Sequence, residues 1–508
     1  MNLLVFAQLL GATLAATDSA PPRPAVALAL RHATVIDLAS ERAVPGQTIV
    51  IRGKNIISVA PDADARIPAK AQIIDCNGRY LIAGLWDMHV HVPELVLPGD
   101  TALSTRLGWA YISRLLLANG VTGVRVASGN LKRLSGFRSQ VDADVMAGPR
   151  MLLTGQKVGE QPVVQGAPFP IVTEDDARAS VQLLKRRGAD FVKVSSALPA
   201  PLWRAVADQS RREHLQLVGH VPTTVSLTEA ASLGLSSAEH LFNLPRETAE
   251  DDNLPSQQKL TTVLSRKTGR VLSWLRIVDQ PPDAFDVAIA THDTSKSRQK
   301  FTALREHDTW VTPTLVLTTS MLQEHDRVAA VNRQRYQLDG MNGPRLVDVR
   351  SIKPRLHSAQ ALAFHFALVR ELRDAGVGIL AGTDSPALDV PGFALHDELQ
   401  LLVRAGLTPA AALRSATADV GRFLQADSVG VIRAGATADL VLLDEDPLQD
   451  ISATRRISTV ISAGHVYNRR SLDRMLDAAA KIVEQLPSQS ARTRSASSAT
   501  SERSENPR

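Results

Sequence analysis

Apolar runs of strand length alternate with helical patterns through the middle of this chain. Most runs are separated by amphipathic helical patterns such as residues 104–120 and 174–188. Strands that alternate with helices predict a parallel sheet. Eight such units predict an α/β fold of the (β/α)8 TIM barrel type, with functional residues at the carboxyl ends of the strands. The eight runs are GLWDMHVH, GVTGVRVAS, GPRMLLTG, DFVKVSS, LQLVGHV, LSSAEHL, WVTPTLV and GILAGTDS.

Both ends of the chain alternate apolar and polar positions between turns that contain glycine. This two-residue period is typical of a half-exposed sheet. We therefore expect residues 27–82 and 425–470 to form one small β-sandwich domain beside a barrel of residues 83–424. Residues 471–487 predict an amphipathic C-terminal helix, and the Ser- and Arg-rich residues 488–508 predict a disordered tail.

Two connections in the predicted barrel are longer than a minimal crossover. They are residues 242–308, after the sixth run, and residues 317–377, after the seventh. Long insertions at the catalytic face of a barrel usually shape a pocket or form a lid. The sequence does not assign a more specific role to either connection.

The first residues of the chain predict an export signal. Residues 1–20 hold an apolar stretch that is followed by small residues, and this stretch is too short to span a bilayer. No Lys or Arg precedes Arg23, so the usual positive start of a signal peptide is missing. We expect a cleaved signal peptide and a periplasmic or secreted protein. A disordered or mis-started leader is the alternative.

The composition is that of an ordinary globular protein, and it limits the classes of molecule that the protein is expected to bind. The chain has 508 residues, of which 44% are hydrophobic and 21% charged, and a formal charge of +5. No basic run with interleaved aromatic residues occurs, so we expect a small-molecule substrate, no nucleic acid and no membrane beyond export. The composition leaves a homo-oligomer open. Cys76 is the single cysteine, so a bound metal would be held by imidazole and oxygen ligands.

Polar side chains recur at the carboxyl ends of the predicted strands. His89 and His91 end the first run, and residues i and i+2 of a strand point to the same face. Each residue alone has a bland interpretation, such as a packed core histidine or a snorkelling lysine. Together they would place four imidazoles, an amine and a carboxylate at one rim of the barrel. The six residues are His89, His91, Lys193, His220, His240 and Asp384.

The segments around these residues resemble the amidohydrolase superfamily. HVH, ADFVKV, VGHVP, SSAEHL and AGTDS occur in the order of that superfamily. They are similar in particular to the imidazolonepropionase-like and zinc prolidase-like members with a binuclear site. The resemblance extends over roughly residues 27–470 and includes the closing GATADLVLLD.

The resemblance implies two divalent metal ions, with Zn²⁺ the first expectation. Nitrogen and oxygen ligands suit zinc, and they do not exclude manganese, cobalt or iron. Lys193 would be N6-carboxylysine, because a carbamate offers the two oxygens that a bridge between metals needs. The implied ligands are His89, His91 and Asp384 for one ion, His220 and His240 for the second, and carboxylated Lys193 for both.

The implied activity is hydrolysis of an amide or related C–N bond, in a dipeptide or an N-acyl amino acid. A bridging hydroxide activated by the metals would attack, and Asp384 would be the catalytic base. One alternative is a mononuclear deaminase or a lactone or ester hydrolase on the same scaffold. Lys193 favours two metals but does not separate amide from ester cleavage. A non-catalytic structural relative is the remote alternative, and the filled ligand positions argue against it.

The evidence for substrate-binding residues is thinner. Arg125 and Lys157 could pair with a substrate carboxylate, although a structural ion pair explains Arg125 equally well. Val126 stands where relatives usually have an acid after the arginine, which affects the surroundings of the ligands. Further candidates for pocket lining or hydrogen bonding are Trp310, Thr312, Thr314, His307 and His396.

Overall fold

The computed structural model describes most of the chain in six stretches. The predicted signal peptide and the predicted tail lie outside them, as do the middle parts of the two long connections. Among the residues that are described, no helix is both long enough and apolar enough to cross a membrane. The described stretches are residues 27–93, 101–159, 171–250, 287–322, 333–338 and 358–486.

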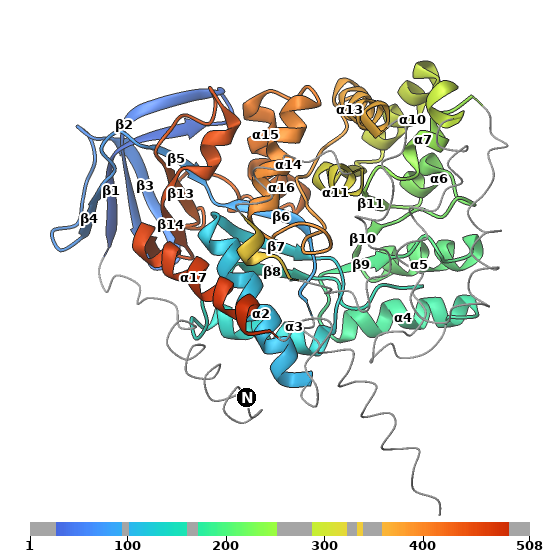
Figure 1. The fold of residues 1–508 in the computed structure, drawn as a ribbon, viewed down its shortest axis with the longest axis horizontal. Helices are drawn as coiled ribbons and strands as arrows, with labels where there is room; N and C mark the ends of the chain where they lie inside the picture. The colour runs from blue at the N-terminus through green and yellow to red at the C-terminus, as the bar shows by residue number, and fades with distance from the viewer. Residues whose placement is uncertain are drawn as a thin grey trace, which may run out of the picture.

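Strands from both ends of the chain share one sheet. Its strand order is β15-β14-β13-β5-β1-β2-β3, and β4 also pairs with β1. The antiparallel pair of β5 and β13 joins the N-terminal and C-terminal segments, which are blue and red in Figure 1. The strands are β1 (Leu28–Asp37), β2 (Arg42–Arg52), β3 (Asn55–Pro61), β4 (Gln72–Asp75), β5 (Tyr80–Ala83), β13 (Leu440–Leu443), β14 (Ile457–Ser462) and β15 (His465–Asn468).

Seven of the eight predicted central runs form parallel strands. They belong to a three-stranded sheet, β6-β7-β8, and a four-stranded sheet, β12-β11-β10-β9. The eighth run, residues 378–385, is an extended segment that makes parallel bridges from Ile379 to Val311 and from Ser385 to Val90. The strands are β6 (Leu85–Val90), β7 (Val121–Val126), β8 (Arg150–Leu153), β9 (Phe191–Val194), β10 (Gln216–Gly219), β11 (Leu235–Glu239) and β12 (Trp310–Thr312).

Helices connect the parallel strands and lie outside them (Figure 1). The start of α4 shows why the helices begin where they do, because Thr173 and Asp176 form a capping box. The predicted C-terminal helix is α17, which packs on α2. The helices are α2 (Thr101–Ala118), α3 (Leu131–Asp142), α4 (Glu174–Arg186), α5 (Ala200–Arg212), α6 (Leu227–Ser232), α7 (Leu244–Glu247), α10 (Thr294–Glu306), α11 (Leu315–Met321), α13 (Ser358–Asp374), α14 (Phe393–Arg404), α15 (Pro409–Ser415), α16 (Ala418–Phe423) and α17 (Arg469–Gln485).

A buried apolar cluster among the parallel strands lies directly below the predicted rim. Phe191 of β9 and Val218 of β10 belong to this cluster. Side chains two residues apart in a strand point to the same face. Lys193 therefore points to the same face as Phe191, and His220 to the same face as Val218, one step closer to the carboxyl end of each strand. The apolar cluster closes the space below the polar side chains.

Two glycines allow the strand ends to approach each other. A Cβ on Gly219, at φ +134°, would lie 2.4 Å from the carbonyl oxygen of Val194. A Cβ on Gly382 would lie 2.9 Å from the Cβ of His89. Both distances are too short for any side chain, so glycine is required beside these two predicted metal-binding segments.

Candidate active site

The six predicted site residues lie at the carboxyl ends of the parallel strands and in the extended segment 378–385. Five of them are almost fully buried, whereas the side chain of His91 is 30% exposed. His89 is in β6 and His91 follows it, Lys193 is in β9, His220 follows β10, His240 follows β11, and Asp384 is in the extended segment.

His89, His91 and Asp384 form a compact donor group. The distance from Asp384 Oδ1 to Nε2 is 2.9 Å for His91 and 3.5 Å for His89. One donor atom from each of the three residues lies within 4.8 Å of the other two. Two imidazoles and one carboxylate at this spacing can bind a single divalent metal ion.

His220 and His240 extend this group on the other side of His89. The ring centroids are 4.8 Å apart for His89 and His240, and 5.2 Å apart for His240 and His220. Asp384 Oδ2 lies 3.8 Å from His240 Nε2, so the carboxylate faces both donor groups. Lys193 Nζ lies 3.4 Å from His89 Nε2. The structure thus brings all six predicted residues together.

The two ring nitrogens of His220 are buried and have no hydrogen-bond partner among the described residues. A buried polar atom without a partner costs free energy, and such atoms are rare in folded proteins. A metal ion at this position would satisfy one of these nitrogens. This observation fits a ligand better than a packed core histidine, which was the bland interpretation of His220.

Burial keeps the imidazoles of His89, His220 and His240 neutral. Burial, followed by the charge of Lys193, lowers the pKa of His89 to about 4. Burial also holds the pKa of His220 and of His240 well below the ordinary histidine value. A neutral imidazole retains the lone pair that a metal ion requires. At pH 7 these three side chains are therefore in the form that binds a metal.

The pKa values of Lys193 and Asp384 are both lowered, and the two shifts have different consequences. Burial lowers the pKa of the Lys193 amine to about 7, so much of it is neutral and nucleophilic near that pH. For Asp384, burial alone would raise the pKa, but the imidazoles of His89 and His91 outweigh burial and hold the pKa below its ordinary value. Asp384 is therefore a carboxylate at neutral pH, able to accept a proton or bind a cation.

Glu239 is a site residue that the sequence interpretation missed. Its carboxylate accepts a hydrogen bond from His89 Nδ1 at 2.6 Å and one from Arg125 Nη2 at 2.5 Å. The pair of Arg125 and Glu239 is fully buried. Fixing one ring nitrogen of His89 turns the other nitrogen toward Asp384. The signal was present in SSAEHL, since Ser237 and Glu239 share one strand face.

Two other histidines have outer partners of the same kind. His240 Nδ1 lies 2.7 Å from Thr314 Oγ1, and His91 Nδ1 lies 2.9 Å from Ser128 Oγ. In both cases the second ring nitrogen faces Asp384. Ser128 stands two residues after Val126, the position where the acid of relatives is missing. Although Val126 replaces that acid, His91 still has a hydrogen-bond partner in Ser128.

Asp87 connects the two segments that carry the first donor group. Its buried carboxylate accepts hydrogen bonds from the backbone nitrogen of His89 at 3.2 Å and from Thr383 Oγ1 at 2.7 Å. Thr383 immediately precedes Asp384. One carboxylate therefore holds the end of β6 and the extended segment in register, which fixes the separation of His89 and Asp384.

Three residues around the site adopt left-handed backbone conformations that favour glycine. They are His240 at φ +65°, Asp384 at φ +57° and Thr314 at φ +50°. Such a conformation is least favourable for the β-branched Thr314. Strained backbone persists where surrounding contacts enforce it, and it is concentrated at functional sites. The strain supports a functional role for this cluster.

The structure gives different positions to the weaker candidates for substrate binding. Of the two interpretations left open for Arg125, the structure favours the structural ion pair, because Arg125 is buried against Glu239. Lys157 lies beside the site, since the backbone nitrogen of Val158 donates to the carbonyl of Lys193. His307 is exposed just before β12, at the opposite strand end from the site.

The other four candidates have structural contacts, and Thr314 is the hydrogen-bond partner of His240 described above. His396 is buried in α14 between Thr454 Oγ1 and the carbonyl of Asn119, away from the six residues. Trp310 belongs to the apolar cluster, and Thr312 accepts a long hydrogen bond from Arg125. These residues support the site from below or lie outside it, so none of them is a candidate for substrate contact.

Comparisons with known proteins give short sequence matches and long structural ones. An adenine deaminase of Rubrobacter xylanophilus is 27% identical over 22% of this chain and 17% of the deaminase. An ochratoxinase of Aspergillus niger is 38% identical over 20% of this chain and 21% of the ochratoxinase. The chain thus matches about a fifth of the length of these relatives. A crystal structure of a Xaa-Pro dipeptidase has a TM-score of 0.60 at 18% identity, covering 87% of this chain and 100% of the dipeptidase.

The structural likeness indicates a shared α/β fold. The model of one protein family matches residues 80–467, which is more than half of the chain and includes all six site residues. This match extends from β5 to β15. It therefore covers all the parallel strands and four strands of the terminal sheet, β5, β13, β14 and β15. The chain therefore belongs to the amidohydrolase family.

Proposed function

We propose that this protein is a metal-dependent hydrolase that cleaves an amide or related C–N bond, with a dipeptide or an N-acyl amino acid as substrate. The observation that carries the proposal is the convergence of four imidazoles, one carboxylate and one buried amine at the ends of parallel strands and in the extended segment 378–385. Family membership supports hydrolytic chemistry. The prolidase-like and imidazolonepropionase-like assignments remain part of the proposal.

The scaffold of this site would be a closed (β/α)8 barrel. Hydrogen bonds of the extended segment 378–385 support closure, because the backbone nitrogen of Met88 donates to Ala381 and that of Val311 donates to Gly378. A parallel bridge between Val158 and Val194 connects the two parallel sheets. In such a barrel the carboxyl ends of all strands meet at one rim, as the proposed site requires.

The residues present fit two divalent metal ions. His89, His91 and Asp384 would hold one ion, and His220 and His240 the second. The unpartnered ring nitrogens of His220 favour this assignment. Nitrogen and oxygen donors suit zinc. When bound, such ions supply a water of lowered pKa and polarise the substrate carbonyl.

Lys193 would act as a carbamate that binds both ions. Its neutral amine adds to the carbon of carbon dioxide and loses a proton to solvent, which leaves an anionic carboxylate on the side chain. The lowered pKa of Lys193 supports this step, because the protonated amine has no lone pair for the addition. The strand that carries Lys193, β9, is buried along its whole length.

Asp384 would move the proton of the reaction. Its carboxylate lies within 4 Å of the imidazoles on both sides, at 2.9 Å from His91 and 3.8 Å from His240. It would accept a proton from the attacking water and deliver it to the leaving nitrogen. Its lowered pKa keeps it ionised at neutral pH, and the hydrogen bonds around Asp87 keep it in place.

The test of the proposed function is a hydrolysis screen combined with metal analysis. We expect purified protein to contain about two equivalents of divalent metal and to release amino acids from dipeptides or N-acyl amino acids. Removal of metal by a chelator should abolish this activity, and added Zn²⁺ should restore it. Adenine and simple lactones belong in the same screen, because a deaminase and an ester hydrolase are the alternatives. Activity that survives complete metal removal would refute the proposal.

A Glu239→Gln variant should weaken metal binding about 10- to 100-fold. Glutamine keeps the size of the side chain but removes the charge that orients His89 and balances Arg125. Chelator competition on purified protein measures the change in metal affinity. Thermal stability should fall as well, since Arg125 would retain a buried charge without its counter-ion.

The matched control is Glu229→Gln on α6. Glu229 also pairs with an arginine, Arg204, but this pair is partly exposed, whereas the pair of Glu239 and Arg125 is fully buried. The control should bind metal like the parent protein. If Glu239→Gln also binds metal with unchanged affinity, the assigned orienting role of Glu239 is wrong.

A further inference from the structure

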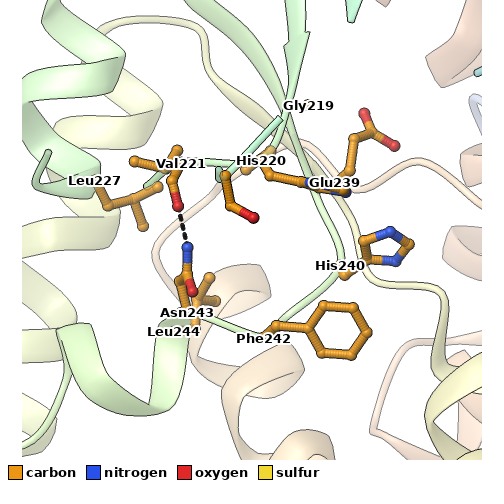
Figure 2. Close-up of a pocket in the computed structure, with 11 residues that line it drawn as sticks. Gly219, His220, Val221, Leu227, Glu239, His240, Phe242, Asn243 and Leu244 are labelled. Atoms are coloured by element: carbon orange, nitrogen blue, oxygen red, sulfur yellow. Dashed lines mark hydrogen bonds between the residues drawn. The ribbon is translucent and has the colours of Figure 1, made fainter. Parts of the chain in front are cut away.

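A small cavity lies between the segments that follow β10 and β11. His220 and His240 form part of its wall, and the apolar side chains of Val221, Leu227 and Leu244 form another part. Figure 2 shows Leu227, Val221 and Leu244 on one side of this space, with the ring of His240 and the carboxylate of Glu239 on the other. The cavity thus adjoins the donor groups of the proposed site.

The walls of the cavity are held in place by contacts between the two segments. The side-chain amide of Asn243 donates a hydrogen bond to the carbonyl of Val221, drawn as the dashed line in Figure 2. Phe242 stacks on the ring of His240, with centroids 4.7 Å apart. Leu227 and Leu244 are each 2% exposed, so they have fixed positions in the packed interior. The cavity is therefore preformed.

The size and polarity of the cavity limit what can enter. Its volume is about 30 Å³, whereas one water molecule needs roughly 10 to 15 Å³ on this scale. There is room for a few non-hydrogen atoms, which is the size of a short aliphatic side chain. Glu239, the one carboxylate in the wall, is already paired with Arg125. The cavity offers no free charge for an ionic side chain.

We propose that this cavity receives a short aliphatic side chain, such as that of alanine or valine, from the residue next to the scissile bond. The inference rests on the proposed function and specifies its substrate class. The side chain lies in the apolar part of the cavity, against Leu227 and Leu244, and the ion that His220 and His240 would hold lies at the opposite wall, where the scissile carbonyl is held. Longer and aromatic side chains exceed the space.

The test uses two series of dipeptides, varied separately at the N-terminal and the C-terminal residue through Gly, Ala, Val and Phe. In one series we expect kcat/KM to be highest for Ala or Val and about tenfold lower for Phe. Leu227→Ala should enlarge the cavity and shift the optimum of that same series toward Phe. Leu227→Val removes a single methylene and should give a smaller shift in the same direction.

Leu131→Ala is the matched control, because Leu131 is also a buried first residue of a helix and lies outside the cavity wall. It should lower stability like Leu227→Ala without changing the order of substrates. A uniform loss in Leu227→Ala, equal to that of the control, would overturn the inference.

Binding gives a readout that does not depend on turnover. The same dipeptides are titrated calorimetrically into Asp384→Asn protein, with and without Leu227→Ala. Tighter binding of Ala or Val than of Phe, reversed by Leu227→Ala, supports the inference even if no dipeptide is cleaved and the proposed function fails. Equal affinities along both series would refute it.

Discussion

Replacing Lys193 with alanine is expected to remove bound divalent metal and to lower kcat/KM by about 10²- to 10³-fold. Lys193 Nζ lies 3.4 Å from His89 Nε2 at the junction of the two donor groups. Asp384 also faces both groups, but Lys193 is the one amine among the six site residues. Without the bridging oxygens, the remaining imidazoles and Asp384 would hold the metals less tightly and less precisely. Metal analysis and steady-state kinetics measure both effects.

Chemical rescue distinguishes a lost carbamate from a general disturbance. Alanine leaves a space with the shape of the removed side chain, and acetate or propionate should enter it and supply the missing oxygens. We expect partial recovery of both metal content and activity at high concentrations of these acids. A variant with two bound metals and full activity without added acid would contradict the carbamate assignment.

The matched control for Lys193 is Lys185→Ala, since Lys185 is exposed in the last turn of α4. This variant should retain metal and activity and should not respond to acetate. Thermal unfolding is measured for both variants. Lys193→Ala should remain folded, because removal of a buried amine also removes the cost of its desolvation.

The sequence was informative wherever one strong periodicity governed both packing and chemistry. The alternation of strands and helices predicted an α/β fold, which is confirmed, and seven of the eight predicted runs are strands. The two-residue period also placed His89 and His91 on one side of their strand end. In the structure both imidazoles face Asp384, so this pair was grouped correctly before any contact was known.

The partners of the donor residues could not be derived in the same way. The sequence left Arg125 open between a substrate contact and a structural ion pair, because it does not reveal that Glu239 lies opposite Arg125 across the strands. The link from Asp87 to Thr383 joins segments almost 300 positions apart (|i−j| = 296). Such pairs depend on how strands are ordered and staggered, and local patterns do not encode this.

The eighth run shows a limit of another kind. Residues 378–385 have the apolar pattern of a strand and make backbone hydrogen bonds to the segments on both sides, yet they form isolated bridges instead of a continuous ladder. Gly382 and the left-handed conformation of Asp384 interrupt a regular ladder there. The site needs Asp384 to turn toward His91 and His240, and this requirement outweighs regular strand geometry.

Asp384→Asn is expected to lower kcat by about 10²- to 10⁴-fold while the protein remains folded. Asparagine has the size of aspartate and tolerates a positive φ, so it should accept the backbone conformation at φ +57°. The hydrogen bond from the backbone nitrogen of residue 384 to the carbonyl of His89, at 2.7 Å, is independent of the side chain. The substitution therefore removes the charge and the basicity and leaves the framework.

Metal content separates the two tasks of Asp384. Loss of activity together with the ion held by His89 and His91 would mean that metal binding dominates, whereas loss of activity with both ions retained would identify proton transfer as the main role. The control is Asp374→Asn at the exposed end of α13, which should behave like the parent protein. Because the carboxylate of Asp384 faces imidazoles of both groups, a variant with unchanged kcat would be incompatible with a reaction at this site.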